Sequence, residues 1–231
     1  MMKEFLMTSA FFGVFLSLIT YEIGVFVRKK TGLTFLTPLV TATAIVIVVL
    51  VLTGIDYETY KTSTSVLTYF LTPATVCLAV PLYQKLEILK KNFVAVILGI
   101  VSGVLVSALT ILGFCILFKF DHVSYVSLLP KSITTAIGIS VSEELGGIVA
   151  ITTAAIIIAG NVGGMFAEII FKIFRINEPI SKGLALGTAS HVMGTSKAME
   201  IGELEGAMGS LAIAVAGIIT VVVLPFFANL V

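Results

Sequence analysis

The sequence predicts an all-α membrane protein: a polytopic transmembrane bundle of about six spans, with two broken or re-entrant helical hairpins and an inverted repeat. Composition is the first observation, since 58% of the 231 residues are hydrophobic and 12% are charged, whereas a soluble domain carries about 25% charged residues. Apolar runs of spanning length then follow one another, and two related polar motifs interrupt the second half. We treat residues 1–231 as a single integral membrane domain.

A transmembrane helix needs about 20 mostly apolar residues. Six runs of this kind are present, at 5–27, 35–54, 65–83, 93–118, 147–171 and 207–231. The first run is longer than a signal-peptide core, so we expect it to be retained as a helix. The third run contains Pro73 and Pro81, which remove backbone donors and bend or break a helix. We therefore expect a broken helix inside the bundle, where neighbours satisfy the freed carbonyls.

The orientation follows from the lysines and arginines of the short connections, which gather on the cytoplasmic side of a membrane protein. One side carries Arg28, Lys29, Lys30, Lys85, Lys90, Lys91, Lys172, Arg175 and Lys182. The other side carries Lys3, Lys61 and Lys119. We therefore expect the ends of the odd-numbered spans to be cytoplasmic and both chain termini to be external.

One pattern occurs twice, as GISVSEELG and as GTSKAMEIG. Its glycines are the expected positions of broken helix: Gly138, Gly146, Gly194 and Gly202. The surrounding segments, 130–146 and 183–206, leave from opposite sides of the membrane under the expected topology. Two hairpins that enter the membrane from opposite sides are typical of the inverted repeats of secondary transporters. Polar, glycine-rich segments at membrane depth are also candidates for function.

Hydroxyls and lysines in these two segments are the candidate substrate contacts. A helix that starts after Ser132 or Thr134 would be capped and would point its positive end at an anion. The alternative is a solvated external loop that leads into an amphipathic helix. The candidate residues are Lys131, Ser132, Thr134, Thr135, Ser140, Thr188, Ser190, Thr195, Ser196 and Lys197.

Three residues are candidates for the coupling ion or a proton relay: His191, Glu144 and Glu200. A histidine titrates near neutral pH and can carry a proton, although a hydrogen-bonded structural role is the alternative for His191. Lys197 and Glu200 are three residues apart, so they can also form an ordinary helical ion pair. The sequence leaves these alternatives open.

No enzymatic motif is present, and we expect neither catalysis nor a cofactor. Cys77 and Cys115 sit in apolar runs without a ligand spacing, so we expect two small buried thiols rather than a disulfide or a metal pair. His122 and His191 are 69 positions apart and suggest no metal site. The net charge of +1 gives no basic field that would attract nucleic acid.

At these segments the chain resembles the LrgB/CidB family of bacterial inner-membrane proteins. The resemblance rests on LTPATVCLAVPLYQ, PKSITTAIGISVSEELGG and LALGTASHVMGTSKAMEIGELEGA. Related sequences form the C-terminal half of the plant plastidic glycolate/glycerate translocator. The family usually reads PKSxTTPIA, whereas this chain has Ala136 in place of the proline and Gly138 in place of the following small residue.

The resemblance implies a multi-pass protein of the bacterial cytoplasmic membrane that works with a smaller partner of the LrgA/CidA type. It implies either a holin/antiholin-like regulator of murein hydrolase activity or a carrier of small carboxylates such as pyruvate, glycolate, glycerate or lactate. The residues favour the carrier, because a holin-type lesion has no evident need for two polar broken-helix motifs. We also expect a homo-oligomer, with the lipid bilayer and a small carboxylate anion as further partners.

Overall fold

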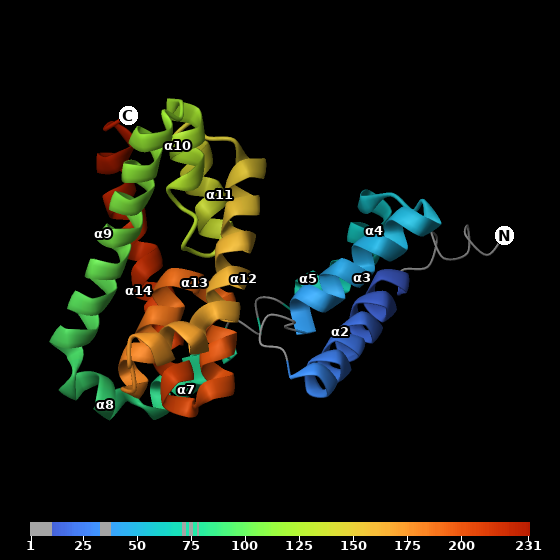
Figure 1. The fold of residues 1–231 in the computed structure, drawn as a ribbon, viewed down its shortest axis with the longest axis horizontal. Coiled ribbons are helices and arrows are strands. Elements are labelled where there is room, and N and C mark those ends of the chain that lie inside the picture. The colour runs from blue at the N-terminus through green and yellow to red at the C-terminus, as the bar shows by residue number, and fades with distance from the viewer. Residues whose placement is uncertain (1–10, 33–37, 71–72, 74–75, 78) are drawn as a thin grey trace. The chain divides into compact units, whose positions relative to one another are not determined.

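A computed structural model describes residues 11–32, 38–70, 73, 76–77 and 79–231, and all of its regular elements in those ranges are helices (Figure 1). The all-α prediction is therefore confirmed. The chain forms two compact units, 1–77 and 78–231, which we describe one at a time. The prediction of a single membrane domain stays a prediction.

The helices in the described residues of the first unit include α2 (Phe12–Thr31), α3 (Pro38–Thr53), α4 (Tyr57–Ser63) and α5 (Ser65–Tyr69). α2 and α3 approach closely at Gly24, where a Cβ atom would lie 2.9 Å from the Cα of Pro38. The residues expected at the start of the first two spans, 5–10 and 35–37, lie outside the described residues.

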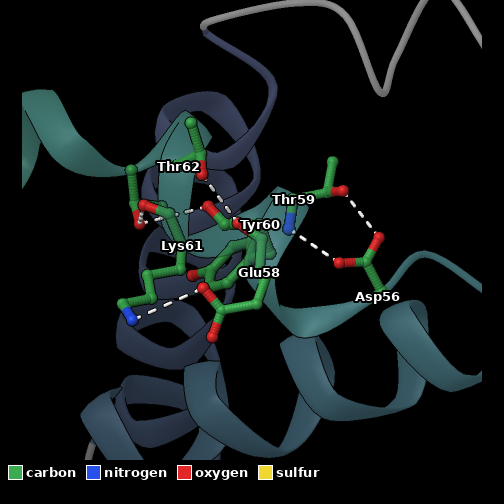
Figure 2. Close-up of polar contacts among 7 residues, drawn as sticks. Asp56, Glu58, Thr59, Tyr60, Lys61 and Thr62 are labelled. Carbon is green, nitrogen blue, oxygen red and sulfur yellow. Dashed lines mark hydrogen bonds and ion pairs between the residues drawn. The ribbon is translucent and has the colours of Figure 1, made fainter.

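Local hydrogen bonds fix the start of α4 (Figure 2). Asp56 is the N-cap, and its carboxylate accepts hydrogen bonds from the Thr59 hydroxyl at 2.6 Å and the Thr59 amide at 3.0 Å. These two bonds hold the pKa of Asp56 below its usual value. α4 is tied to α2 by the Gly13 amide, which donates to the Ser63 hydroxyl at 3.0 Å.

In the third predicted span, 65–83, the structure describes α5 and α7 (Ala79–Gln84), and Pro73, Val76 and Cys77 between them are also helical. Several residues around Pro73 lie outside the described residues, so the expected break there is not described. Pro81 lies within α7, and the helix continues beyond it to Gln84.

The second unit continues through α8 (Leu86–Lys91), α9 (Phe93–Phe118), α10 (His122–Leu128), α11 (Thr135–Glu144), α12 (Val149–Ile173), α13 (Pro179–Ile201) and α14 (Glu203–Ala228). Among the described residues, α9, α12 and α14 are long and apolar enough to cross a membrane. They correspond to the fourth, fifth and sixth predicted spans. α3 is apolar but shorter.

α10 and α11 form the first hairpin, and hydrogen bonds connect it to α12 and α14. The Tyr125 hydroxyl of α10 donates to the carbonyl of Phe227 at 2.9 Å, near the C-terminal end of α14. The Thr152 hydroxyl donates to the Ser127 carbonyl at 2.8 Å, and it also bonds the Ser142 hydroxyl at 2.6 Å. These bonds connect α10, α11 and the start of α12.

α13 is the second hairpin, because its backbone reverses at Ser190 and His191. His191 has φ 42° and ψ −132°, a left-handed conformation that L-residues rarely adopt. After the reversal, Gly194 packs directly against the Leu186 carbonyl, although eight residues of straight helix would separate the two positions by about 12 Å. Lys182 and Ile201, from opposite arms, also line one surface pocket.

The two hairpins enter the second unit from opposite ends (Figure 1). The first is bound near the C-terminal end of α14, as described above. The second lies near the N-terminal end of α14, since Gly183 packs against the Glu205 carbonyl. Opposed hairpins are the arrangement that the two motif segments lead us to expect.

None of the four motif glycines lies at the backbone reversal of α13, which is at Ser190 and His191. Gly138 lies within α11 and Gly194 lies within the second arm of α13. Gly146 has φ +79°, which a residue without a Cβ atom adopts at little cost, and it follows the end of α11. Gly202 is extended and separates α13 from α14.

Candidate functional site

A cavity of about 690 Å³ lies between α9 and the first arm of α13, entirely within the second unit. Its mouth is lined by Asn92, Glu178 and Ser181, which lie where α9 and α13 begin. Its inner end is lined by Ser107, Lys131, Ser132 and Thr188. Val106, which is 60% exposed, and Thr110 also line it. The cavity therefore runs along α9 from its start to beyond its middle, and it is open at the side of that helix.

Small residues on α9 leave the space for this cavity. Ala95, Gly99, Gly103 and Ser107 recur every four residues and line one wall, because residues four apart share a helix face. Thr188 of α13 lies opposite: a Cβ atom on Gly103 would be 2.7 Å from its methyl carbon. Larger side chains along this stripe would fill the cavity.

Lys131 is the central charge at the inner end. It lies on the loop between α10 and α11, and its ammonium group donates to the Ser132 hydroxyl at 3.0 Å and the Ser107 hydroxyl at 3.3 Å. The two hydroxyls are themselves 3.0 Å apart. In the described part of the chain, no carboxylate forms an ion pair with Lys131. A charge removed from bulk water needs a partner, so this site favours an anion.

Thr188 adds a second polar group to the inner end. The residue is 7% exposed, and its hydroxyl has no hydrogen-bond partner among the described residues. Most buried polar side chains in proteins do have a partner. An unsatisfied hydroxyl beside Lys131 is therefore consistent with a site that a ligand or water completes.

The other candidates of the first motif lie away from the cavity lining. Thr134 is the N-cap of α11 but makes no side-chain cap bond, and Thr135 is the first residue of the helix. Ser140 is exposed and donates to the Ala136 carbonyl of its own helix at 3.2 Å. Glu144 is exposed at the C-terminal end of α11.

Ser190 and His191 form the buried tip of the second hairpin. The His191 imidazole bonds the Ile156 carbonyl of α12 at 3.0 Å through Nε2. A Cβ atom on Gly160 would be 2.6 Å from that nitrogen, and Gly163 lies against the Ser190 hydroxyl in the same way. The glycines of α12 therefore provide the space into which the tip packs.

The second arm of α13 carries the remaining candidates. Thr195 is buried against Gly209 of α14 with an unpartnered hydroxyl, and Ser196 is exposed. Lys197 is buried and pairs with Glu168 of α12 and with Glu200 at 3.3 Å. The helical pair considered for Lys197 and Glu200 is thus present, with Glu168 as an additional partner.

Lys197 links α12 and α13 through its ion pairs, and we expect Lys197→Gln to lower stability. Both carboxylate partners are about half exposed, so the loss is near 1 kcal/mol, or about 2–4 °C in Tm. A thermal-shift measurement on purified protein checks this. An unchanged Tm would contradict the structural role.

Ser107 is the residue of this site that sequence reasoning missed. It lies in a predominantly apolar helix, α9, so its hydroxyl was not connected to the motif 25 residues later. The signal that could have found it is the stripe of small residues on α9. Such a stripe indicates a helix face that approaches another backbone or borders a space.

Ser107→Ala removes a hydroxyl that bonds both Lys131 and Ser132, and we expect the affinity of the cavity for a small anion to fall about 3–10-fold, the worth of one hydrogen bond. Ser102→Ala is the matched control on the same helix, because Ser102 is exposed, bonds its own helix at Gly99 and does not line the cavity. Binding of a series of small anions to the purified variants measures both. Equal affinities for the two variants would count against the site.

Metal ligands do not gather in the described residues: no group of three histidine, cysteine, aspartate or glutamate side chains could hold a metal ion there. Cys77 is exposed, contrary to the expectation of two buried thiols, and Cys115 is buried; both are free. The site's chemistry rests on one ammonium group and several hydroxyls.

The fold and the site define a helical membrane protein whose long apolar helices enclose two opposed hairpins. A family model described as the LrgB-like family matches residues 17–230. The chain therefore belongs to the LrgB-like family, a family of membrane proteins with holin/antiholin-like or transporter-related roles, and the resemblance seen in the motifs is confirmed. No solved structure matches the chain.

Proposed function

We propose that this protein is a secondary transporter of small monocarboxylates of the pyruvate, glycolate, glycerate or lactate class, and that the α9–α13 cavity is its substrate site. One observation carries the proposal. The cavity ends at the Lys131 ammonium, which has hydroxyl neighbours but no ion-pair partner in the described residues.

The chemistry of the inner end suits a carboxylate. Lys131 would donate a charge-assisted hydrogen bond to one carboxylate oxygen, and the hydroxyls of Ser107 and Ser132 would bind the other. α11 begins just after this loop, at Thr135, so its positive end adds to the attraction. Apolar residues along the walls, such as Val106 and Leu184, suit the hydrocarbon part of the substrate.

The architecture suits a carrier that exposes its site to the two sides of the membrane in turn. We propose that the opposed hairpins form an inverted repeat, as in other secondary transporters. The charges support a cytoplasmic cavity mouth, because the chain around α8 and around the α12–α13 connection carries Lys85, Lys90, Lys91, Lys172, Arg175 and Lys182. This orientation agrees with the positive-inside rule.

Proton coupling is part of the proposal, and His191 is its leading candidate. The imidazole is buried at the tip of the second hairpin and is hydrogen-bonded to the Ile156 carbonyl of α12. Protonation there would change the charge at the backbone reversal of α13. Glu200 pairs with Lys197 and Glu144 is exposed at the far end of α11, so both are weaker candidates.

We further propose a location in the bacterial cytoplasmic membrane with six spans and external termini, a homo-oligomeric assembly, and a partner of the LrgA/CidA type. No enzymatic activity is part of the proposal. The second candidate function is holin/antiholin-like control of lysis, which family membership also supports.

Liposomes that contain the purified protein and a trapped dye separate the two functions. Carrier activity predicts saturable uptake of labelled pyruvate or glycolate under an imposed pH gradient, with the dye retained. Holin-like activity predicts dye leakage that does not depend on Lys131 or Ser107. No uptake above that of empty vesicles, with and without the co-reconstituted partner, would refute the carrier.

A further inference from the structure

The cavity opens on the surface of the second unit along α9, where Val106 is 60% exposed. Beyond its inner end, α9 continues with Ala108, Ile111 and Cys115, which are buried in an apolar cluster. This cluster also contains Leu129 of the first hairpin and Leu224 of α14. A substrate that reached Lys131 would therefore meet packed apolar side chains before the opposite end of the bundle.

A small void of about 10 Å³ lies directly behind the inner end. It shares Ser107, Ser132 and Thr188 with the cavity, so these three residues form a polar wall between the two spaces. The void has room for roughly one water molecule.

Thr220 lines the void from α14. It is 5% exposed and lies in an otherwise apolar stretch of the helix, IITVVVL. Buried hydroxyls inside a membrane helix are costly unless they serve a partner or a pathway. Thr188, whose hydroxyl has no partner in the described part of the chain, lines both spaces, and Thr220 lines only the void. The polar groups therefore continue from Lys131 past Thr188 to Thr220.

Leu129 and Leu224 complete the lining of the void on its far side. They are 2% and 1% exposed, and they belong to different structural parts, since Leu129 is on the first hairpin and Leu224 is on α14. Apolar constrictions of this kind exclude water and ions. A shift of the hairpin relative to α14 would separate the two leucines.

We infer that the translocation route continues from the cavity through the void beside Thr220, and that Leu129 and Leu224 are the gate that closes it. This inference rests on the proposed function and adds the residues that separate the two sides. In the conformation described, the route is open at the cavity and closed at the two leucines. Translocation opens the leucine gate and exposes Thr220 to the opposite side.

Single cysteines in full-length protein test the route in membrane vesicles of both orientations. Cys77→Ser and Cys115→Ala provide the background, and Ser181→Cys marks the cavity mouth. We expect a charged, membrane-impermeant thiol reagent to modify Ser181→Cys from one face. Thr220→Cys should react from the opposite face, at a rate that glycolate changes. Ser210→Cys is the matched control, because Ser210 is also a buried hydroxyl of α14 but lines neither space.

Thr220→Cys that is unreactive from both faces, or reactive only from the face of Ser181→Cys, overturns the inference. A second pair of variants does not depend on this cysteine. Leu224→Ala should increase downhill glycolate flux, whereas Leu186→Ala, equally buried but between α12 and α13, should not. Equal glycolate fluxes through Leu224→Ala and Leu186→Ala would also contradict the role of Leu224 as a gate. Wild-type protein that moves no carboxylate refutes the proposed function instead, and the cysteine results still report on the route.

Discussion

Lys131→Gln is expected to abolish most saturable carboxylate uptake at low substrate concentration. The substitution keeps a polar side chain of similar length but removes the positive charge at the inner end of the cavity. Hydrogen bonds to charged groups contribute about 1.5–3 kcal/mol, so the KM should rise roughly 10- to 100-fold. Initial rates of labelled glycolate or pyruvate uptake in liposomes measure this directly.

The matched control is Lys91→Gln. Lys91 is exposed in the last turn of α8 and does not line the cavity, so this change removes the same charge without touching the site. Lys91→Gln should keep the wild-type Tm within about 2 °C, since exposed charges contribute little to stability. Uptake by Lys131→Gln at the wild-type KM would show that the cavity is not the substrate site.

Gly194→Ala is expected to cause the largest loss of stability among single methyl additions to α13. The new methyl group would meet the backbone of the other arm, with the Leu186 carbonyl carbon at 2.8 Å and the Ser190 Cβ at 2.6 Å. Forcing extra atoms into a packed contact costs about 1–3 kcal/mol, which corresponds to a fall in Tm of about 2–10 °C. Thermal unfolding of the detergent-purified protein measures the effect.

Gly113→Ala provides the control for helix propensity. Gly113 lies in α9, and a Cβ atom there would meet nothing within 4 Å. Alanine is a better helix former than glycine by about 1 kcal/mol, so this variant should be neutral or slightly more stable. If Gly194→Ala were as stable as Gly113→Ala, the arms of α13 could not pack as closely as described.

The long apolar helices could be predicted from the sequence because hydrophobicity and length determine them. α9 spans the same residues, 93–118, that the apolar run predicts. The boundaries of α12 and α14 differ from prediction by a few residues. For α14 the difference includes Glu203 and Glu205, which the helix holds in its first turn, where acidic side chains favour the helix dipole.

The place of the hairpin break could not be predicted from the glycines alone. His191 adopts a left-handed conformation that its own chemistry disfavours, and contacts with another helix hold it there. The His191 imidazole is hydrogen-bonded to the Ile156 carbonyl of α12, and its ring packs against Gly160 of the same helix. Local sequence cannot reveal such a tertiary effect, although Gly160 and its glycine neighbours signal close packing.

Only part of the candidate site could be predicted, because the sequence identifies polar residues but not where the fold places them. Lys131, Ser132 and Thr188 are polar residues in apolar surroundings, and the structure brings them to one cavity. Ser190, Thr195 and Lys197 have the same character, but the structure places them in hairpin packing or an ion pair. Residue type therefore identifies polar groups at depth, whereas only the fold separates those that face a cavity from those that hold helices together.

Solute counterflow tests the central claim, that this protein is a carrier which exposes one site to each side in turn. Vesicles are loaded with unlabelled glycolate and diluted into a trace of labelled glycolate, without a pH gradient. Alternating exposure predicts a transient accumulation of label above its equilibrium level, which Lys131→Gln weakens. Monotonic equilibration of the label, at a rate that does not depend on the loaded substrate, would indicate a pore and would contradict the account.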